Sequence, residues 1–320
     1  MRNLEEIFAR ENRKRKLSRR EFVKTAGILA GAAAASSLFP RRLRAEPSPP
    51  PRETFDLLVV EGSDYPRLIE TALKEFGFPK TMLTPGGTVV IKPNAAWSRT
   101  PEQAANTNPV LLTALIKACR KAEASRIAVA EHPCDNYKSA FRINGIREAV
   151  EDAGAEMIPL AEDDQFREVS IPRGKVLKKA AVGKPILEAD FYVNFPIAKV
   201  HGAAKLTMAM KNHMGAVQDR WFFHRNDLNQ CIADISSYLR PDLTILDCTR
   251  ILTTNGPKGP GEVKTLNRIV VGFDQAAIDS YGTTLFGMKP DDLAYLRAAG
   301  EMGLGKTDLS RIRVKEIAVS

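Results

Sequence analysis

Basic and imidazole side chains are concentrated in one stretch of the chain, residues 199–225. Three of the four histidines, His201, His213 and His224, fall within this stretch. Imidazole can exchange a proton near neutral pH, and a lysine amine can bind an anionic group. The stretch therefore predicts a site that binds an anionic small molecule and transfers a proton to or from it.

A helix over residues 203–213 would bring part of this stretch onto one face. Spacings of four, three and four residues follow the helical repeat and join His201, Lys205, Met208 and Asn212. On this interpretation His201 and His224 are candidate catalytic groups for proton transfer, and Lys205 and Lys211 stabilise developing negative charge. An amphipathic helix whose basic stripe faces water is the plainer alternative.

Two other segments carry candidate ligand-binding residues. Lys92 ends an apolar run at Pro93, which stops a strand from continuing, and Asp247 ends the apolar run 243–247. The loop 255–262 is dense in glycine and proline and could present backbone amides to an anion, although it lacks the order of a Walker loop. We predict ligand or cofactor contacts from five residues: Lys92, Asn94, Asn212, Asp247 and Gly256.

A metal site is an open alternative. Two or three of His201, His213 and His224 could act with Asp247 or a cysteine, but the chain shows no HExxH spacing. The four cysteines form no CxxC pair, which argues against a zinc ribbon or a cysteine-ligated iron–sulfur cluster within this chain. If a disulfide forms, Cys134 and Cys248 are the favoured pair because both follow predicted strands. The metal and the cofactor stay unidentified.

Short apolar runs alternate with amphipathic stretches from residue 55 onward, which is typical of an α/β fold with a largely parallel sheet flanked by helices. We predict strands at 56–61, 88–92, 126–131, 190–195, 243–247, 268–273 and 312–318. We predict helices at 65–77, 109–123, 145–153, 203–213, 227–239, 274–286 and 290–300. The pattern of apolar residues is less regular over 161–187, where we predict a small hairpin or insertion.

This fold class predicts where the ligand lies. In open parallel sheets ligands bind beyond the carboxyl ends of the strands. That rule selects the segments 92–108, 131–144, 196–225 and 247–266, which hold most of the unusual polar residues. We therefore expect Lys92, the 199–215 stretch and the loop after Asp247 to meet in a common pocket.

The N-terminal part predicts export. Ser18-Arg19-Arg20-Glu21-Phe22 resembles a twin-arginine signal, and an Ala- and Gly-rich apolar run to Phe39 and a cleavage candidate at Ala45 follow it. We divide the chain into a signal peptide (1–45), a proline-rich linker (46–54) and an α/β domain (55–320). The expected partner is the twin-arginine translocase and the expected location is the periplasm or cell envelope. Whether the leader is cleaved or kept as an anchor stays open.

Most of the net positive charge of the chain lies in this predicted leader. Residues 1–45 carry 12 of the 47 Lys and Arg but only 4 of the 38 Asp and Glu, so the remaining chain is near neutral despite a net charge of +9. A general nucleic-acid partner is therefore not expected.

The ordered set of motifs resembles a bacterial and archaeal family, the domain of unknown function 362, over roughly residues 56–290. The resemblance is carried by Val90-Ile91-Lys92-Pro93-Asn94, the run from Lys199 to Gly215, His224 before Cys231-Ile232-Ala233-Asp234-Ile235, Leu246-Asp247, Asn255-Gly256-Pro257, and Asp274 with Asp279. It implies functional positions at Lys92, His201, Lys205, Lys211, Asn212, His224 and Asp247.

The resemblance assigns no reaction. Many members carry ferredoxin-like cysteine motifs that imply a redox setting, and this chain lacks them, so an electron-transfer partner would be a separate protein. Three functions stay open: an enzyme acting on an anionic small molecule, a metal-binding or redox component of the cell envelope, and a non-catalytic ligand-binding protein.

Overall fold

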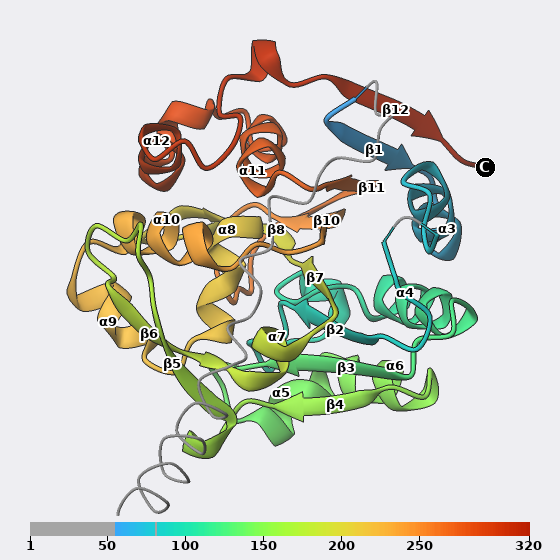
Figure 1. Ribbon diagram of the computed structural model, residues 1–320. Coiled ribbons are helices and arrows are strands. Elements are labelled where there is room, and N and C mark those ends of the chain that lie inside the picture. Colours follow the sequence, from blue (N-terminus) through green and yellow to red (C-terminus); the bar gives the residue numbers. More distant parts are fainter. Residues whose placement is uncertain (1–54, 81) are drawn as a thin grey trace, which may run out of the picture. The chain divides into compact units, whose positions relative to one another are not determined.

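Segments of three to ten residues, most of them with an apolar run, form the strands of one ten-stranded sheet in the described chain (Figure 1). The computed structural model describes residues 55–80 and 82–320, so the predicted signal peptide and the predicted linker both lie outside the described residues. The main strand order is β12-β1-β11-β10-β7-β2-β3-β4, and the hairpin β8-β9 joins beside β10. Along this order β11 runs antiparallel to both of its neighbours and the other pairs are parallel. The predicted α/β class with a largely parallel sheet is confirmed.

The strand bounds follow the predicted runs closely at most positions. They are β1 (Leu57–Glu61), β2 (Thr88–Pro93), β3 (Arg126–Glu131), β4 (Glu156–Pro159), β7 (Phe191–Phe195), β8 (Ile197–His201), β9 (Lys205–Thr207), β10 (Leu243–Leu252), β11 (Val263–Gly272) and β12 (Val314–Ala318). The predicted insertion is a separate hairpin, β5 (Phe166–Ser170) and β6 (Lys179–Gly183). Strands β4, β8 and β9 were not predicted.

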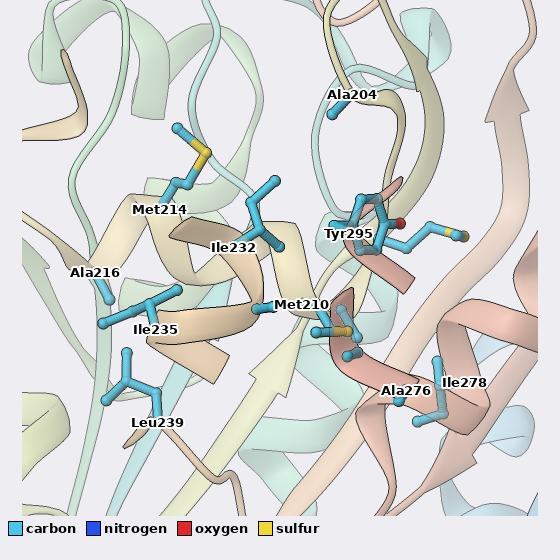
Figure 2. Close-up of a cluster of buried hydrophobic side chains, with 14 of the residues drawn as sticks. Ala204, Met210, Met214, Ala216, Ile232, Ile235, Leu239, Ala276, Ile278 and Tyr295 are labelled. Atoms are coloured by element: carbon cyan, nitrogen blue, oxygen red, sulfur yellow. The ribbon is translucent and has the colours of Figure 1, made fainter. Parts of the chain in front are cut away.

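Both faces of the sheet are buried, because successive side chains point to opposite faces and both sets are apolar. On β1, Leu57 and Val59 belong to one core cluster, and Leu58 and Val60 belong to the other. The second cluster is covered by α3 (Tyr65–Glu75), α4 (Pro109–Lys121), α5 (Tyr137–Ile143) and α6 (Ile146–Asp152). The first is covered by α7 (Lys184–Glu188), α8 (Ala209–Asn212), α10 (Leu228–Tyr238), α11 (Gln275–Thr284) and α12 (Ala294–Glu301), and Figure 2 shows part of its packing.

Side chains cap the starts of two helices that flank the sheet. The Asn108 side chain accepts a hydrogen bond from the Val110 amide, with Pro109 in the first turn. The Asp274 carboxylate accepts from the amides of Ala276 and Ala277 at the start of α11. Short helix α9 (Arg220–Arg225) packs against α10, and single 3₁₀ turns lie at Pro101–Gln103, Asp163–Gln165, His213–Ala216, Pro290–Asp292 and Leu309–Arg311.

The predicted helix over 203–213 is wrong. Lys205 has a φ of +62°, in the left-handed region, and pairs with His201 in the hairpin β8-β9. Helix α8 begins only at Ala209, where both oxygens of the buried Asp279 carboxylate accept hydrogen bonds from the amides of Ala209 and Met210, at 2.6 and 3.0 Å. A contact from α11, distant in sequence, therefore sets the start of the helix that carries Lys211.

Two smaller features bear on export. All four cysteines are free, so the disulfide considered between Cys134 and Cys248 is not formed. Among the described residues no helix has both the length and the apolar character needed to cross a membrane.

Candidate functional site

A cavity of about 540 Å³ lies at the carboxyl ends of β2, β3 and β8. Lys92 lines it from β2, Glu131 from β3 and Lys199 from β8. Residues 207–215 and helix α9 form other walls, and Pro257 reaches it from the loop after β10. The three segments that the sequence predicted to meet are therefore brought together.

Positive charge dominates the lining. Glu131 is the one carboxylate among the described lining residues, against four basic side chains: Lys92, Lys199, Lys211 and Arg220. Glu131 forms an ion pair with Lys92. The other three basic groups form no ion pair within residues 55–80 and 82–320, so Lys211 and Arg220 in particular have no described carboxylate to compensate their charge.

Lys92 and Glu131 form a buried ion pair at the base of the cavity. The Lys92 Nζ lies 2.9 Å from Glu131 Oε2, and each side chain is 1% exposed. Burial lowers the pKa of Lys92 and raises the pKa of Glu131, while the attraction between the two charges opposes both shifts. Glu131 Oε1 is buried and accepts no hydrogen bond from the described residues.

Gly215 allows this pair to approach the backbone. A Cβ at this position would overlap Glu131 Oε1 and lie 2.7 Å from Lys92 Nζ. The Gly215 carbonyl also accepts a hydrogen bond from the His132 amide at 2.8 Å. A side chain here would displace the ion pair or the chain segment that follows α8.

Asparagine side chains orient the lysines. Two of these asparagines, Asn94 and Asn212, were predicted from the sequence as ligand-binding residues. Asn212 Oδ1 accepts from Lys92 Nζ at 3.3 Å and from Asn94 Nδ2 at 3.2 Å. Asn212 Nδ2 donates to Asn194 Oδ1 at 2.8 Å. Asn94 Oδ1 in turn accepts from Lys199 Nζ at 3.0 Å, so one network links two of the cavity's lysines.

Lys199 is buried with uncharged partners only. Its side chain donates hydrogen bonds to Asn94 Oδ1 and to the Ala105 carbonyl, and the residue is 1% exposed. Burial, followed by the positive charge of Lys211, lowers the pKa of Lys199 to about 7. At neutral pH a large fraction of this lysine is therefore the uncharged amine.

Lys211 and Arg220 supply the cationic groups best suited to an anion. The Lys211 ammonium contacts Met214 Sδ at 3.6 Å, a weak acceptor, and burial lowers the pKa of this lysine to about 8. Arg220 donates to the His132 and Pro133 carbonyls at 2.8 and 2.7 Å. These neutral acceptors hold the guanidinium in place without compensating its charge.

Both predicted catalytic histidines lie at the cavity. His201 Nδ1 accepts hydrogen bonds from the amides of Ala203 and Ala204, at 3.1 and 3.2 Å, so the neutral ring carries its proton on Nε2. Burial, followed by the charges of Lys211 and Lys199, lowers the pKa of His201 to about 3. His201 is thus a neutral hydrogen-bond donor at physiological pH.

His224 is more exposed and lines the cavity from α9, with its ring 5.9 Å from that of Trp221. Burial lowers its pKa first, and the charges of Lys211 and Arg220 lower it further. This position suits exchange of a proton with solvent better than the half-buried position of His201.

Lys205 and Asp247 do not line the cavity. Lys205 is exposed on β9, because the hairpin replaces the predicted helix. Asp247 is fully buried, with Oδ2 accepting from the Asn108 amide at 2.8 Å and Oδ1 from the Thr249 amide and hydroxyl at 2.9 and 2.7 Å. Asp247 therefore joins β10 to the start of α4.

Gly256 and His213 also lie outside the cavity. Gly256 packs against the Val200 carbonyl so closely that a Cβ would overlap it, and the next residue, Pro257, reaches the cavity instead. His213 is fully buried, with Nε2 2.6 Å from Gln275 Oε1 and Nδ1 3.2 Å from the Tyr192 hydroxyl. Of the three histidines considered for a metal site, His213 thus lies apart from the other two, and the described residues hold no group of three or more His, Cys, Asp or Glu that could bind a metal ion.

Several lining residues were missed from the sequence. The strand-end rule selected the segments 131–144 and 196–225, which contain Glu131, Lys199 and Arg220, but none of these three was named as a site residue. Both tryptophans of the chain, Trp97 and Trp221, line the same cavity. They are far apart in the sequence, so only the fold shows that they meet.

Comparison with known proteins places the chain in a family. It is 22% identical over 247 residues to a thylakoid-associated protein of Synechocystis sp., covering 75% of each chain. It is similar to the lactate racemase apoprotein from Thermoanaerobacterium thermosaccharolyticum (TM-score 0.43, 14% identity), covering 69% of this chain and 55% of that one. It is also similar to a structural-genomics protein from Thermotoga maritima (TM-score 0.44, 11% identity), covering 76% of this chain and 60% of that one.

The chain thus spans little more than half the length of these two solved structures. A model of the domain of unknown function (DUF362) matches residues 89–284, which include nearly all of the cavity. Because that match covers more than half of the chain, this protein belongs to the DUF362 family.

Proposed function

We propose that this protein is an exported enzyme that binds a small anionic molecule, carrying a carboxylate or a phosphate, in the cavity. The observation that carries the proposal is Lys211, a buried ammonium whose one described partner is a thioether sulfur. A buried charge without an anionic partner is costly. A site that keeps such a group beside Arg220 is suited to a ligand that supplies the missing negative charge.

The proposed chemistry is proton transfer on the bound anion. Lys211 and Arg220 stabilise negative charge that develops on the ligand, and the His201 Nε2–H donates a hydrogen bond to it. His224, at the more exposed wall, exchanges the proton with solvent. No observation on the described residues favours the metal-binding alternative. A non-catalytic binding protein would bind the same anions without turnover.

We further propose that the twin-arginine signal directs the folded chain to the periplasm or cell envelope. The support is the Arg19-Arg20 motif and its apolar run. The translocase and a small-molecule ligand are then its expected partners, with any redox partner a separate protein. Nucleic acid is not an expected partner, because the basic excess lies in residues 1–45.

Calorimetric titration with inorganic phosphate and with oxalate tests the proposed site. The variants Lys211→Met and Arg220→Gln each remove one charge-assisted hydrogen bond, worth about 1.5–3 kcal/mol, so affinity should fall about 10- to 100-fold. Lys205→Met is the matched control, because it removes an exposed lysine of the neighbouring hairpin, and its affinity should equal that of the wild type. Equal affinities for all four proteins would overturn the proposal.

A further inference from the structure

The hydrogen bonds of Lys199 leave one position of its nitrogen open. A neutral amine has two hydrogens and one lone pair, and Asn94 Oδ1 and the Ala105 carbonyl accept the two hydrogens. Lys199 also lines the cavity. The lone pair of the amine therefore accepts no hydrogen bond from a described donor.

The surroundings of Lys199 favour the amine over the ammonium. Glu131, the one carboxylate among the described lining residues, is held by Lys92 at 2.9 Å, and Lys211 adds a like charge. With a pKa of about 7, about half of Lys199 is uncharged at pH 7, against roughly one in a thousand or fewer for an ordinary surface lysine. A desolvated lysine next to another cation is the usual form of an amine nucleophile in enzymes.

We propose that Lys199 is a nucleophile that forms an imine with the carbonyl group of an anionic aldehyde or ketone bound in this cavity. The inference rests on the proposed function, because Lys211 and Arg220 would hold the carboxylate or phosphate of the same molecule. The His201 Nε2–H would donate to the carbonyl oxygen while Lys199 attacks the carbon.

The reaction balances without an oxidant or a reductant. The Lys199 nitrogen forms a bond to the carbonyl carbon and gives up one proton, and the oxygen takes up one proton, which gives a neutral carbinolamine. The oxygen then takes up a second proton, from solvent, the C–O bond breaks, water leaves, and the nitrogen lone pair forms the C=N bond. Overall one amine, one carbonyl group and one proton from solvent yield one protonated imine and one water.

Reductive trapping tests this inference on the full exported protein. Glyoxylate is the anionic aldehyde probe and acetaldehyde the neutral one, each with cyanoborohydride at pH 7, and peptide mass spectrometry locates the modified lysines. Glyoxylate should modify Lys199 at least about tenfold faster than the exposed Lys205, which serves as an internal reference. Lys211→Met should reduce the preference of Lys199 for glyoxylate over acetaldehyde, and Lys205→Met should leave it unchanged.

The wild-type protein alone can overturn the inference, so the result does not depend on whether a variant folds. Modification of Lys199 no faster than that of Lys205, or modification of Lys211 in its place, would refute it. If phosphate binds as proposed and Lys199 is not trapped, the imine fails while the anion site stands. If phosphate does not bind through Lys211 and Arg220, the proposed function fails as well.

Discussion

Replacing Lys199 by methionine should change how the stability of this protein depends on pH. In the folded wild type the pKa of Lys199 is lowered to about 7, mainly by burial, whereas the unfolded chain has the ordinary value of about 10.4. Between these two values the unfolded state binds more protons, so the free energy of unfolding rises with pH. Below pH 7 both states are protonated and this contribution no longer changes.

The structure sets the size of the effect. A shift from 10.5 to about 7 corresponds to at most about 4–5 kcal/mol, and relaxation around a buried ion lowers such penalties, so we expect about 2–4 kcal/mol between pH 7 and pH 10. Methionine has no charge to desolvate and loses this dependence. It also leaves Asn94 Oδ1 and the Ala105 carbonyl without their donor, which costs about 1–3 kcal/mol at every pH.

Urea denaturation of the wild type and Lys199→Met at pH 7 and pH 10 measures the difference. The variant should be close to the wild type, or more stable, at pH 7 and clearly less stable at pH 10. Lys205→Met removes an exposed lysine and should follow the wild type at both pH values. A stability difference between wild type and Lys199→Met that is the same at both pH values would refute the reasoning on Lys199.

Two further predictions concern other parts of the chain. Gly215→Ala should lower the free energy of unfolding by about 1–3 kcal/mol in urea denaturation, because its Cβ would displace the buried Lys92–Glu131 pair, and an unchanged midpoint would contradict the packing described around Gly215. Replacing Arg19 and Arg20 together by lysine should leave the protein in the cytoplasmic fraction, because the translocase reads the paired arginines, whereas unchanged export would show that another signal directs the chain.

The sequence predicted the strands better than the site helix. Runs such as 88–92 are apolar on both faces, and burial on both faces of a parallel sheet requires that pattern, so their position was readable. The 203–213 segment has helical spacing, but its conformation is decided by the left-handed φ of Lys205 and by the distant Asp279 carboxylate. Neither the left-handed backbone of Lys205 nor the contact with Asp279 can be read from the residues of this segment.

Those site residues could be predicted whose place follows from the end of a strand. Lys92 and Asn94 lie at the cavity because the strand rule places them there, and the same rule selected the segment 196–225 that brings Lys211, Asn212, His201 and His224 to it, although the helical face expected for His201 and Asn212 does not form. Asp247 was expected at a strand end, but β10 continues to Leu252, and the Asp247 carboxylate accepts hydrogen bonds from Asn108 and Thr249, partners that the sequence does not reveal.

The most direct test of the anion site is a crystal structure of the mature protein grown with phosphate at a concentration that saturates the calorimetric titration. We predict one phosphate in the cavity, within hydrogen-bonding distance of Lys211 and Arg220. An empty cavity, with phosphate bound elsewhere on the chain at that concentration, would contradict the assignment of this site.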